Sequence, residues 1–313
     1  MPTPLVSIIV RARNEAVSLA RLIPLLARQQ ADFGYEVWLL DNDSHDGSAD
    51  LARAAGWHVH HIPRDAFNYA TALNTGAELA HGDICVSLSA HCFPQTERWL
   101  AELVRPIRED STVVASYGRQ WTNPQVAPFE ALGNDSLFPP AGTPPTITAF
   151  SNANSAYRRA YALQHPFNPV VRILEDHLFL LELPPELRVV YAPEALVHHE
   201  HEHFSWRYNI RRWLREGWSF FFIHDYRGYQ SPFAAQRWIE LEQWLFGYTR
   251  LAAVALKRRR WRLALLTLPF FYLRDLCWLI GRMQAARQRA AIAAADALQP
   301  RPHRPSTVPE QHP

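Results

Sequence analysis

Residues 1–120 alternate short apolar runs with helical patterns, and this alternation restricts the fold more than any other feature of the chain. Strand patterns occupy residues 6–10, 36–40, 57–62 and 84–88, and the run at 6–10 is apolar and bounded by polar residues, as expected for a strand buried in a sheet. Helical patterns lie between them. The β-α-β-α order predicts an α/β fold, Rossmann-like, with a mainly parallel central sheet and helices on both faces.

Three polar segments follow the predicted strands directly. They read "RARNE" at residues 11–15, "DNDSHDGS" at 41–48 and "SAHCFP" at 89–94. In open α/β sheets, ligands bind beyond the carboxyl ends of the strands, so the three segments predict one binding site. Asp, Asn, Ser and Gly also favour tight turns, so the second segment fits a plain turn as well.

The later part of the chain is aromatic and basic. Residues 206–218 and 256–266 interleave arginine with tryptophan and leucine, although the formal net charge of the whole chain is only +2, which does not indicate binding to nucleic acid. Helices of this composition suit the surface of an anionic membrane. A solvated helical subdomain and a homodimer interface remain alternatives. Arg274 and Asp275 interrupt the apolar stretch 263–281, so we expect no membrane span there.

The cysteines and the first residues of the sequence indicate the cellular compartment. The three cysteines include no Cys-x-x-Cys pair, which argues against a disulfide framework and for a reducing compartment. The first residues lack the pattern of a signal peptide. We therefore expect a cytoplasmic protein, peripheral on the inner face of the cell membrane. Its predicted parts are an α/β domain at 1–205, a helical extension at 206–296 and a disordered Pro-rich tail at 297–313.

Four segments, taken in order, resemble a known family. They read "VSIIVRARNEA", "VWLLDNDSHDGSAD", "ALNTGAELAHGDICVSLSAH" and "ILEDHLFLLEL". The chain is similar to the family-2 inverting glycosyltransferases with the GT-A fold, and to bacterial rhamnosyltransferase-like members in particular. The resemblance implies that Glu15 and Asp41 help to hold a nucleoside. Asn42 stands where the family has a second acidic residue, which leaves the identity of the base open.

The metal motif of the family is altered. Where members carry Asp-x-Asp, this chain has Ser89, Ala90 and His91. The resemblance implies a divalent ion, Mg²⁺ or Mn²⁺, beside the donor diphosphate, with His198 or His199 as a further ligand or diphosphate contact. A polar strand end without a metal is the alternative, because one neutral imidazole is a weak substitute for two carboxylates.

The segment "ILEDHLF" contains the adjacent acids Glu175 and Asp176. The resemblance implies that Asp176 is the catalytic base and that Glu175 belongs to the donor and acceptor loop. An inverting transfer needs such a base, because the acceptor hydroxyl must lose its proton as it attacks. An acid-rich helix start is the alternative. Upstream, "SNANSAYRR" implies further contacts to donor and acceptor, which are the polar side chains of Asn152, Asn154 and Ser155 and a positive charge from Arg158 or Arg159.

These inferences combine into one expected function. The chain would move a hexosyl or deoxyhexosyl group, with inversion, from a nucleotide-sugar donor to a hydroxyl of a glycan or polyprenyl-linked acceptor in bacterial surface polysaccharide synthesis. A catalytically inactive nucleotide- or glycan-binding member of the same fold is the alternative, because both carboxylates of Asp-x-Asp are missing.

Overall fold

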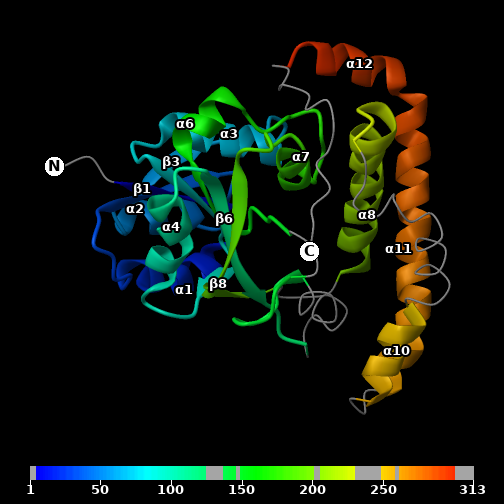
Figure 1. Cartoon of the computed structure of the whole chain (residues 1–313), viewed down its shortest axis with the longest axis horizontal. Helices are drawn as coiled ribbons and strands as arrows, with labels where there is room; N and C mark the ends of the chain where they lie inside the picture. Colours follow the sequence, from blue (N-terminus) through cyan, green and yellow to red (C-terminus); the bar gives the residue numbers. More distant parts are fainter. Residues whose placement is uncertain are drawn as a thin grey trace.

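The computed structural model describes residues 5–124, 137–145, 149–200, 205–229, 248–257 and 261–299. Its sheet has the strand order β3-β2-β1-β4-β7-β6-β8-β5 (Figure 1). The strands are β1 Val6–Ala12, β2 Tyr35–Asp41, β3 His58–His61, β4 Ile84–Ser89, β5 Cys92–Pro94, β6 Val113–Trp121, β7 Asn154–Arg158 and β8 Arg188–His199. The helices around the sheet are α1 Ala16–Ala27, α2 Ser48–Ala54, α3 Tyr69–Leu79, α4 Trp99–Glu109, α6 Arg159–Gln164 and α7 Glu175–Leu181.

All of these strands run in one direction except β5 and β7, which pair antiparallel with their neighbours. The predicted mainly parallel sheet is therefore confirmed, and each apolar run that predicted a strand forms one. The reversed direction of β7 could not be read from the sequence. It decides which end of that strand lies at the candidate site.

Two apolar cores cover the two faces of the sheet. Successive strand residues point to opposite faces, so Ile8 and Val10 of β1 pack with α1, α2 and α4, while Ile9 packs with α3 and α6. The helices on each face bury their own apolar stripes against these strands, including Leu19 and Leu22 of α1. The helices therefore lie on both faces of the sheet, as predicted.

Strands β1, β2 and β4 end nearly level with one another. In the register of the sheet, Ala12 is paired with Asp41, and Arg11 with Ser89. The polar segments that follow these strands therefore meet at one edge of the sheet, as the sequence predicts.

A helical extension follows β8, as predicted. Its elements in the described residues are α8 Trp206–Phe220, the π-helix η1 Phe221–Tyr226, α10 Tyr248–Lys257, α11 Trp261–Arg287 and α12 Arg289–Ala297. Figure 1 shows α8 and α11 side by side, with α8 nearer the sheet and α12 turning back across their upper ends. Residues 300–313, most of the predicted tail, lie outside the described residues.

The close contact of α8 with α11 depends on two glycines. A Cβ atom added to Gly217 would lie 2.1 Å from the carbonyl oxygen of Trp278, and one added to Gly281 would lie 2.2 Å from that of Leu214. Such distances leave no room for a side chain, so the two backbones touch. No helix in the described part of the chain is long and apolar enough to cross a membrane.

Candidate active site

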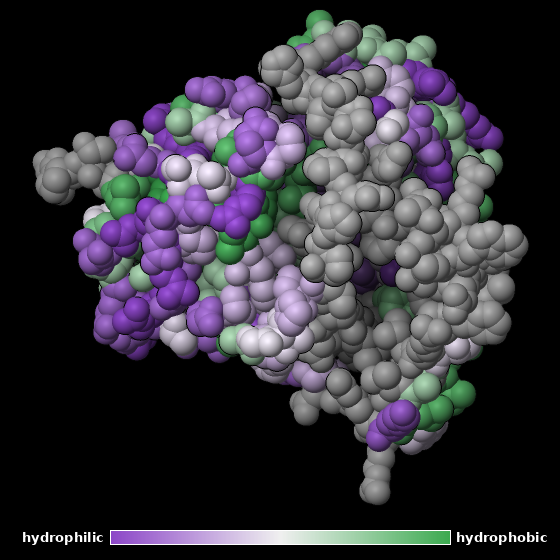
Figure 2. All heavy atoms as spheres, viewed as in Figure 1, coloured by the Kyte–Doolittle hydropathy of each residue, from purple (hydrophilic) through white to green (hydrophobic). Residues whose placement is uncertain are grey.

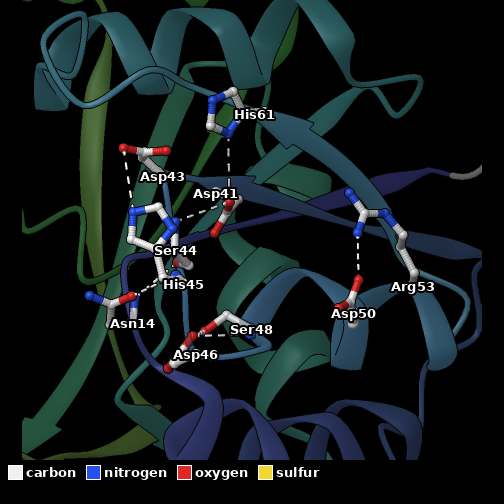
Figure 3. Close-up of polar contacts among 10 residues, drawn as sticks. All are labelled: Asn14, Asp41, Asp43, Ser44, His45, Asp46, Ser48, Asp50, Arg53 and His61. Atoms are coloured by element: carbon white, nitrogen blue, oxygen red, sulfur yellow. Dashed lines mark hydrogen bonds and ion pairs between the residues drawn. The ribbon is translucent and has the colours of Figure 1, made fainter.

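The loops after β1 and β2 form one hydrogen-bonded unit (Figure 3). The backbone N–H of Asn14 donates to Ser44 Oγ at 2.9 Å, and the N–H of His45 donates to Asn14 Oδ1 at 2.9 Å. Asp46 accepts from the N–H of Ala16 at 2.8 Å and from both the N–H and the hydroxyl of Ser48. Asp46 therefore ties the start of α1 to the start of α2 and fixes the distance between the two loops.

Asp41 and Asn42 are buried at the end of β2. Asp41 Oδ2 accepts a long hydrogen bond from the N–H of Ser44 at 3.4 Å and lies 3.7 Å from His61 Nδ1. Among the described residues, neither Asp41 Oδ1 nor Asn42 Oδ1 has a hydrogen-bond partner. Buried polar atoms are nearly always paired, so these two oxygens are suited to accept hydrogen bonds from a ligand.

A hollow of about 430 Å³ opens beside this strand end, and it is lined by Asp43, His61, Pro63, Arg64 and Asp65. Its volume is in the range of small-molecule sites. We did not expect His61 or Arg64 from the sequence. Both follow or end β3, whose carboxyl end lies at the same edge of the sheet, and that position was the available signal.

Glu15 is paired with His91. Its Oε1 lies 3.1 Å from His91 Nδ1, and its Oε2 accepts from the hydroxyl of Ser18 at 2.7 Å. Burial raises the pKa of Glu15, but the hydrogen bonds from His91 and Ser18 outweigh it and leave the pKa below its ordinary value. Glu15 is therefore an anion that faces the altered metal motif, whereas the resemblance placed it beside the nucleoside.

The structure separates the two histidines at the end of β8. The ring of His199 stacks on that of His91, with centroids 5.2 Å apart, and its Nδ1 lies 2.8 Å from Gln120 Oε1. His198 points to the other side of the strand, against Trp121 at 4.6 Å. His199 therefore faces His91 and His198 does not, which corrects the inclusion of His198. The next histidines of this segment lie at 201 and 203, outside the described residues.

The donor set does not form a metal site in the part of the chain that the structure describes. No group of three or more His, Cys, Asp or Glu side chains there is arranged to hold an ion. Glu15 and His91 are paired with each other, and His199 contacts Gln120. The expected site for Mg²⁺ or Mn²⁺ is therefore not assembled by these described residues.

Asp176 lies in the first turn of α7, next to Asn152. Its Oδ1 accepts from the N–H of His177 at 2.8 Å, and its Oδ2 lies 3.4 Å from the N–H of Asn152. Burial, followed by the charge of Glu175, raises the pKa of Asp176 to about 7. Burial is the larger of these two causes.

Asn152 joins the elements around Asp176. Its side-chain amide donates to Glu175 Oε1 at 3.2 Å, and its carbonyl accepts from Arg11 at 2.7 Å and from the hydroxyl of Ser87 at 2.6 Å. Arg11, which the sequence analysis did not single out, also has a buried Nε without a partner among the described residues. Its cation is close enough to lower the pKa of Asp176 against the larger effects of burial and Glu175.

Other residues of the "SNANSAYRR" segment hold the sheet together. Asn154 is fully buried, accepts from Trp99 Nε1 at 3.0 Å and donates to the carbonyl of Ala195 at 2.9 Å. Ser155 is also buried, and its hydroxyl donates to Asn152 Oδ1 at 3.2 Å. These placements correct the expectation that the two side chains contact donor or acceptor.

The two arginines of the same segment lie at the opposite edge of the sheet, because β7 runs antiparallel to β4 and Arg158 is paired with Ile84 at the start of that strand. Arg158 donates to backbone carbonyls, including that of Val113, and Arg159 donates to the carbonyl of Ala77. Neither supplies positive charge to the site.

Comparison with known proteins shows the family to which the chain belongs. Residues 7–164, slightly more than half of the chain, match the family described as glycosyl transferase family 2, and the chain belongs to that family. A search of curated proteins finds no match.

Solved structures share the GT-A fold at low sequence identity. The mannosyltransferase PcManGT from Pyrobaculum calidifontis, in complex with GDP-Man and Mn²⁺, has a TM-score of 0.53 and 19% identity, over 94% of this chain and 86% of that one. Mannosyl-3-phosphoglycerate synthase from Rubrobacter xylanophilus has a TM-score of 0.52 and 17% identity, over 73% and 78%. Glucosyl-3-phosphoglycerate synthase from Mycobacterium tuberculosis, in complex with uridine-diphosphate, has a TM-score of 0.50 and 17% identity, over 73% and 82%.

Proposed function

We propose that the chain is an inverting glycosyltransferase in which Asp176 is the general base. The observation that carries the proposal is the environment of Asp176. Its carboxyl group is near the sheet edge where β1, β2 and β4 end, and burial together with Glu175 brings its pKa to about 7. A base is most effective when its pKa is close to the working pH. Membership of glycosyl transferase family 2 supports this chemistry.

The proposed reaction is a single displacement. The ionised carboxylate of Asp176 takes the proton of an acceptor hydroxyl while that oxygen attacks the anomeric carbon of a nucleotide sugar. The bond from that carbon to the diphosphate oxygen breaks, and the nucleoside diphosphate leaves with the electron pair. Arg11 carries a positive charge near Asp176 and has a buried Nε without a partner among the described residues. It is the residue that we propose to offset the charge of the leaving group.

The unpaired oxygens of Asp41 and Asn42 support the proposal that the nucleoside is held at the end of β2. The hollow beside them, with Arg64 in its lining, has room for a base and its ribose. The proposed donor is a nucleotide sugar carrying a hexosyl or deoxyhexosyl group. The proposed acceptor is a hydroxyl of a glycan or polyprenyl-linked glycan of the bacterial cell surface.

Nucleotide binding is tested by thermal shift with UDP, GDP and dTDP, because a ligand that binds only the folded state raises the melting temperature. We expect at least one nucleotide to stabilise the wild type and the shift to be lost in Asn42→Ala, which removes one of the unpaired oxygens. Asp50→Asn, on the exposed side of α2, is the matched control and should keep the shift. Adding EDTA, Mg²⁺ or Mn²⁺ separates a metal-dependent shift from a metal-independent one. The absence of any shift in the wild type would contradict the nucleotide site.

The catalytic role is tested with Asp176→Asn, which keeps the shape of the side chain but cannot accept the proton. We expect release of nucleoside diphosphate from GDP-mannose or UDP-glucose to fall about 10²- to 10⁴-fold, with the nucleotide thermal shift retained. Asp83→Asn, at the opposite end of β4, is the matched control and should keep full activity.

The alternative is an inactive nucleotide- or glycan-binding protein, and the observation that favours it is the loss of both carboxylates at Ser89 and His91. A wild type that is stabilised by nucleotide but releases no nucleoside diphosphate from either sugar nucleotide, even with added Mg²⁺ or Mn²⁺, would support this alternative and contradict the enzyme.

We also propose that α11 rests on an anionic membrane surface. The exposed residues Leu265, Leu276, Leu279 and Met283 are 70%, 52%, 54% and 51% accessible, and their spacing places them on one side of the helix. Figure 2 shows hydrophobic and hydrophilic residues next to one another at the lower right, where α10 and the start of α11 lie. In the sequence, residues 257–260 read Lys-Arg-Arg-Arg, and of these the structure describes Lys257. An exposed apolar helix face in a segment whose sequence is rich in arginine suits anionic lipid headgroups.

The membrane surface is tested by sedimentation with vesicles of phosphatidylglycerol or phosphatidylcholine. We expect binding to phosphatidylglycerol alone, weakened by high salt, and lost in the double variant Leu276→Glu and Leu279→Glu. Leu163→Glu, at an exposed leucine of α6, is the matched control and should bind as the wild type does. If the wild type binds neither kind of vesicle and sediments as a dimer, while the double variant sediments as a monomer, this face would instead belong to a homodimer interface.

A further inference from the structure

The segment before Asp176 has a strained backbone. Leu174, the residue that precedes α7, has φ 71°, in the left-handed region that non-glycine residues rarely adopt. A bulky residue stays there only where the surrounding structure holds it. The position of Asp176, two residues later, therefore depends on what holds this segment in place.

The holding contacts come from the helical extension. Ser219, fully buried on α8, accepts two backbone hydrogen bonds through its Oγ, from the N–H of Arg172 at 3.1 Å and from that of Ile173 at 3.2 Å. The guanidinium of Arg172 also lies over the ring of Trp218, 4.4 Å from its centroid. One hydroxyl of α8 thus fixes the two residues that precede Leu174.

The same extension holds the other end of α7. Glu182, the C-cap residue of α7, accepts from the hydroxyl of Tyr229 at 3.2 Å. Arg227 lies 4.0 Å from Glu182 and donates to Asp296 of α12 at 2.7 Å. Between the two ends, Leu178 of α7 packs in an apolar cluster formed mainly by the extension, whose other members include Val171, Trp218, Phe222, Ile223, Ala285 and Ile292.

We propose that the helical extension positions the Asp176 segment, and that Ser219 is the positioning residue that holds Arg172 and Ile173 so that the strained turn at Leu174 places Asp176 beside Asn152. The inference rests on the proposed role of Asp176. It gives the extension a part in the reaction that is independent of any membrane contact, because Ser219 lies on α8 and faces the sheet domain.

The test combines hydrogen–deuterium exchange with kinetics on the full chain. In Ser219→Ala, the two N–H groups lose their acceptor, and we expect the amides of residues 171–182 to exchange about tenfold faster or more. We expect turnover of GDP-mannose or UDP-glucose to fall roughly 10- to 100-fold with an unchanged KM for the donor, since a displaced base affects the reaction and not donor binding.

The pH profile provides a readout that a loss of stability alone would not change. The base must be ionised, so wild-type activity should rise through pH 7, where Asp176 loses its proton. In Ser219→Ala the carboxyl group becomes better hydrated, its pKa falls, and the rise should move to lower pH.

Three further variants complete the experiment. Ser219→Thr keeps the hydroxyl and should restore slow exchange and turnover relative to Ser219→Ala. Tyr229→Phe removes the hydrogen bond at the other end of α7 and should speed exchange there even if Ser219→Ala does not fold. Ser116→Ala, at a buried serine of β6 that bonds to the carbonyl of Leu103, is the matched control and should leave exchange at 171–182 and turnover unchanged.

The outcomes separate the two proposals. Exchange at 171–182 that stays at the wild-type rate in both Ser219→Ala and Tyr229→Phe overturns the anchoring. Faster exchange with unchanged turnover overturns its link to Asp176. A wild type that releases no nucleoside diphosphate contradicts the proposed function and, with it, the link between the extension and catalysis by Asp176. The exchange rates at 171–182 still decide in that case whether the extension holds this segment.

Discussion

The hydrogen bonds of Asn152 connect the parts on which the site depends. Its carbonyl accepts from Arg11 of β1 and Ser87 of β4, and its side chain donates to Glu175 at the start of α7. Because Asn152 is almost fully buried, each lost contact would leave a polar group unpaired away from water. Asn152 therefore links the strand ends, where we propose that the donor binds, to the start of α7 and Asp176, where we propose that the acceptor is activated.

Glu15 and Asp176, two carboxylates near this edge of the sheet, have environments that shift their pKa values in opposite directions. Hydrogen bonds from His91 and Ser18 leave the pKa of Glu15 below its ordinary value, although burial opposes them. Burial and Glu175 raise that of Asp176 to about 7. Groups whose pKa values are pushed apart in this way often have different chemical tasks. Here Glu15 is the carboxylate whose anion is favoured and is paired with His91, and Asp176 is the carboxyl group whose pKa lies at about 7.

The sequence predicted the strands and loops that depend on local residue patterns. It did not predict the strand direction and the hydrogen bonds that depend on contacts between distant segments. The apolar runs predicted β1 to β4, and the strand ends predicted where Asp41 and Asn42 meet the loop after β1. Sequence reasoning placed Arg158 or Arg159 at the site because the direction of β7, which is set by its partners, cannot be read from five residues. Arg11 was one residue of the polar segment 11–15, and Ser219 was one serine that follows the aromatic and basic segment 206–218. Only the folded chain shows that they bond to Asn152 and to the Asp176 segment.

The central claim is that the fold holds Asp176 as a base that titrates near neutral pH. The most direct measurement is an infrared difference titration of the wild type against Asp176→Asn, which isolates the carboxylate band of this residue. We predict a midpoint close to pH 7, as burial and Glu175 require. A midpoint close to 4, the range of an exposed aspartate, would contradict the account, because Asp176 would then be hydrated and would not be the poised base on which the proposed transfer depends.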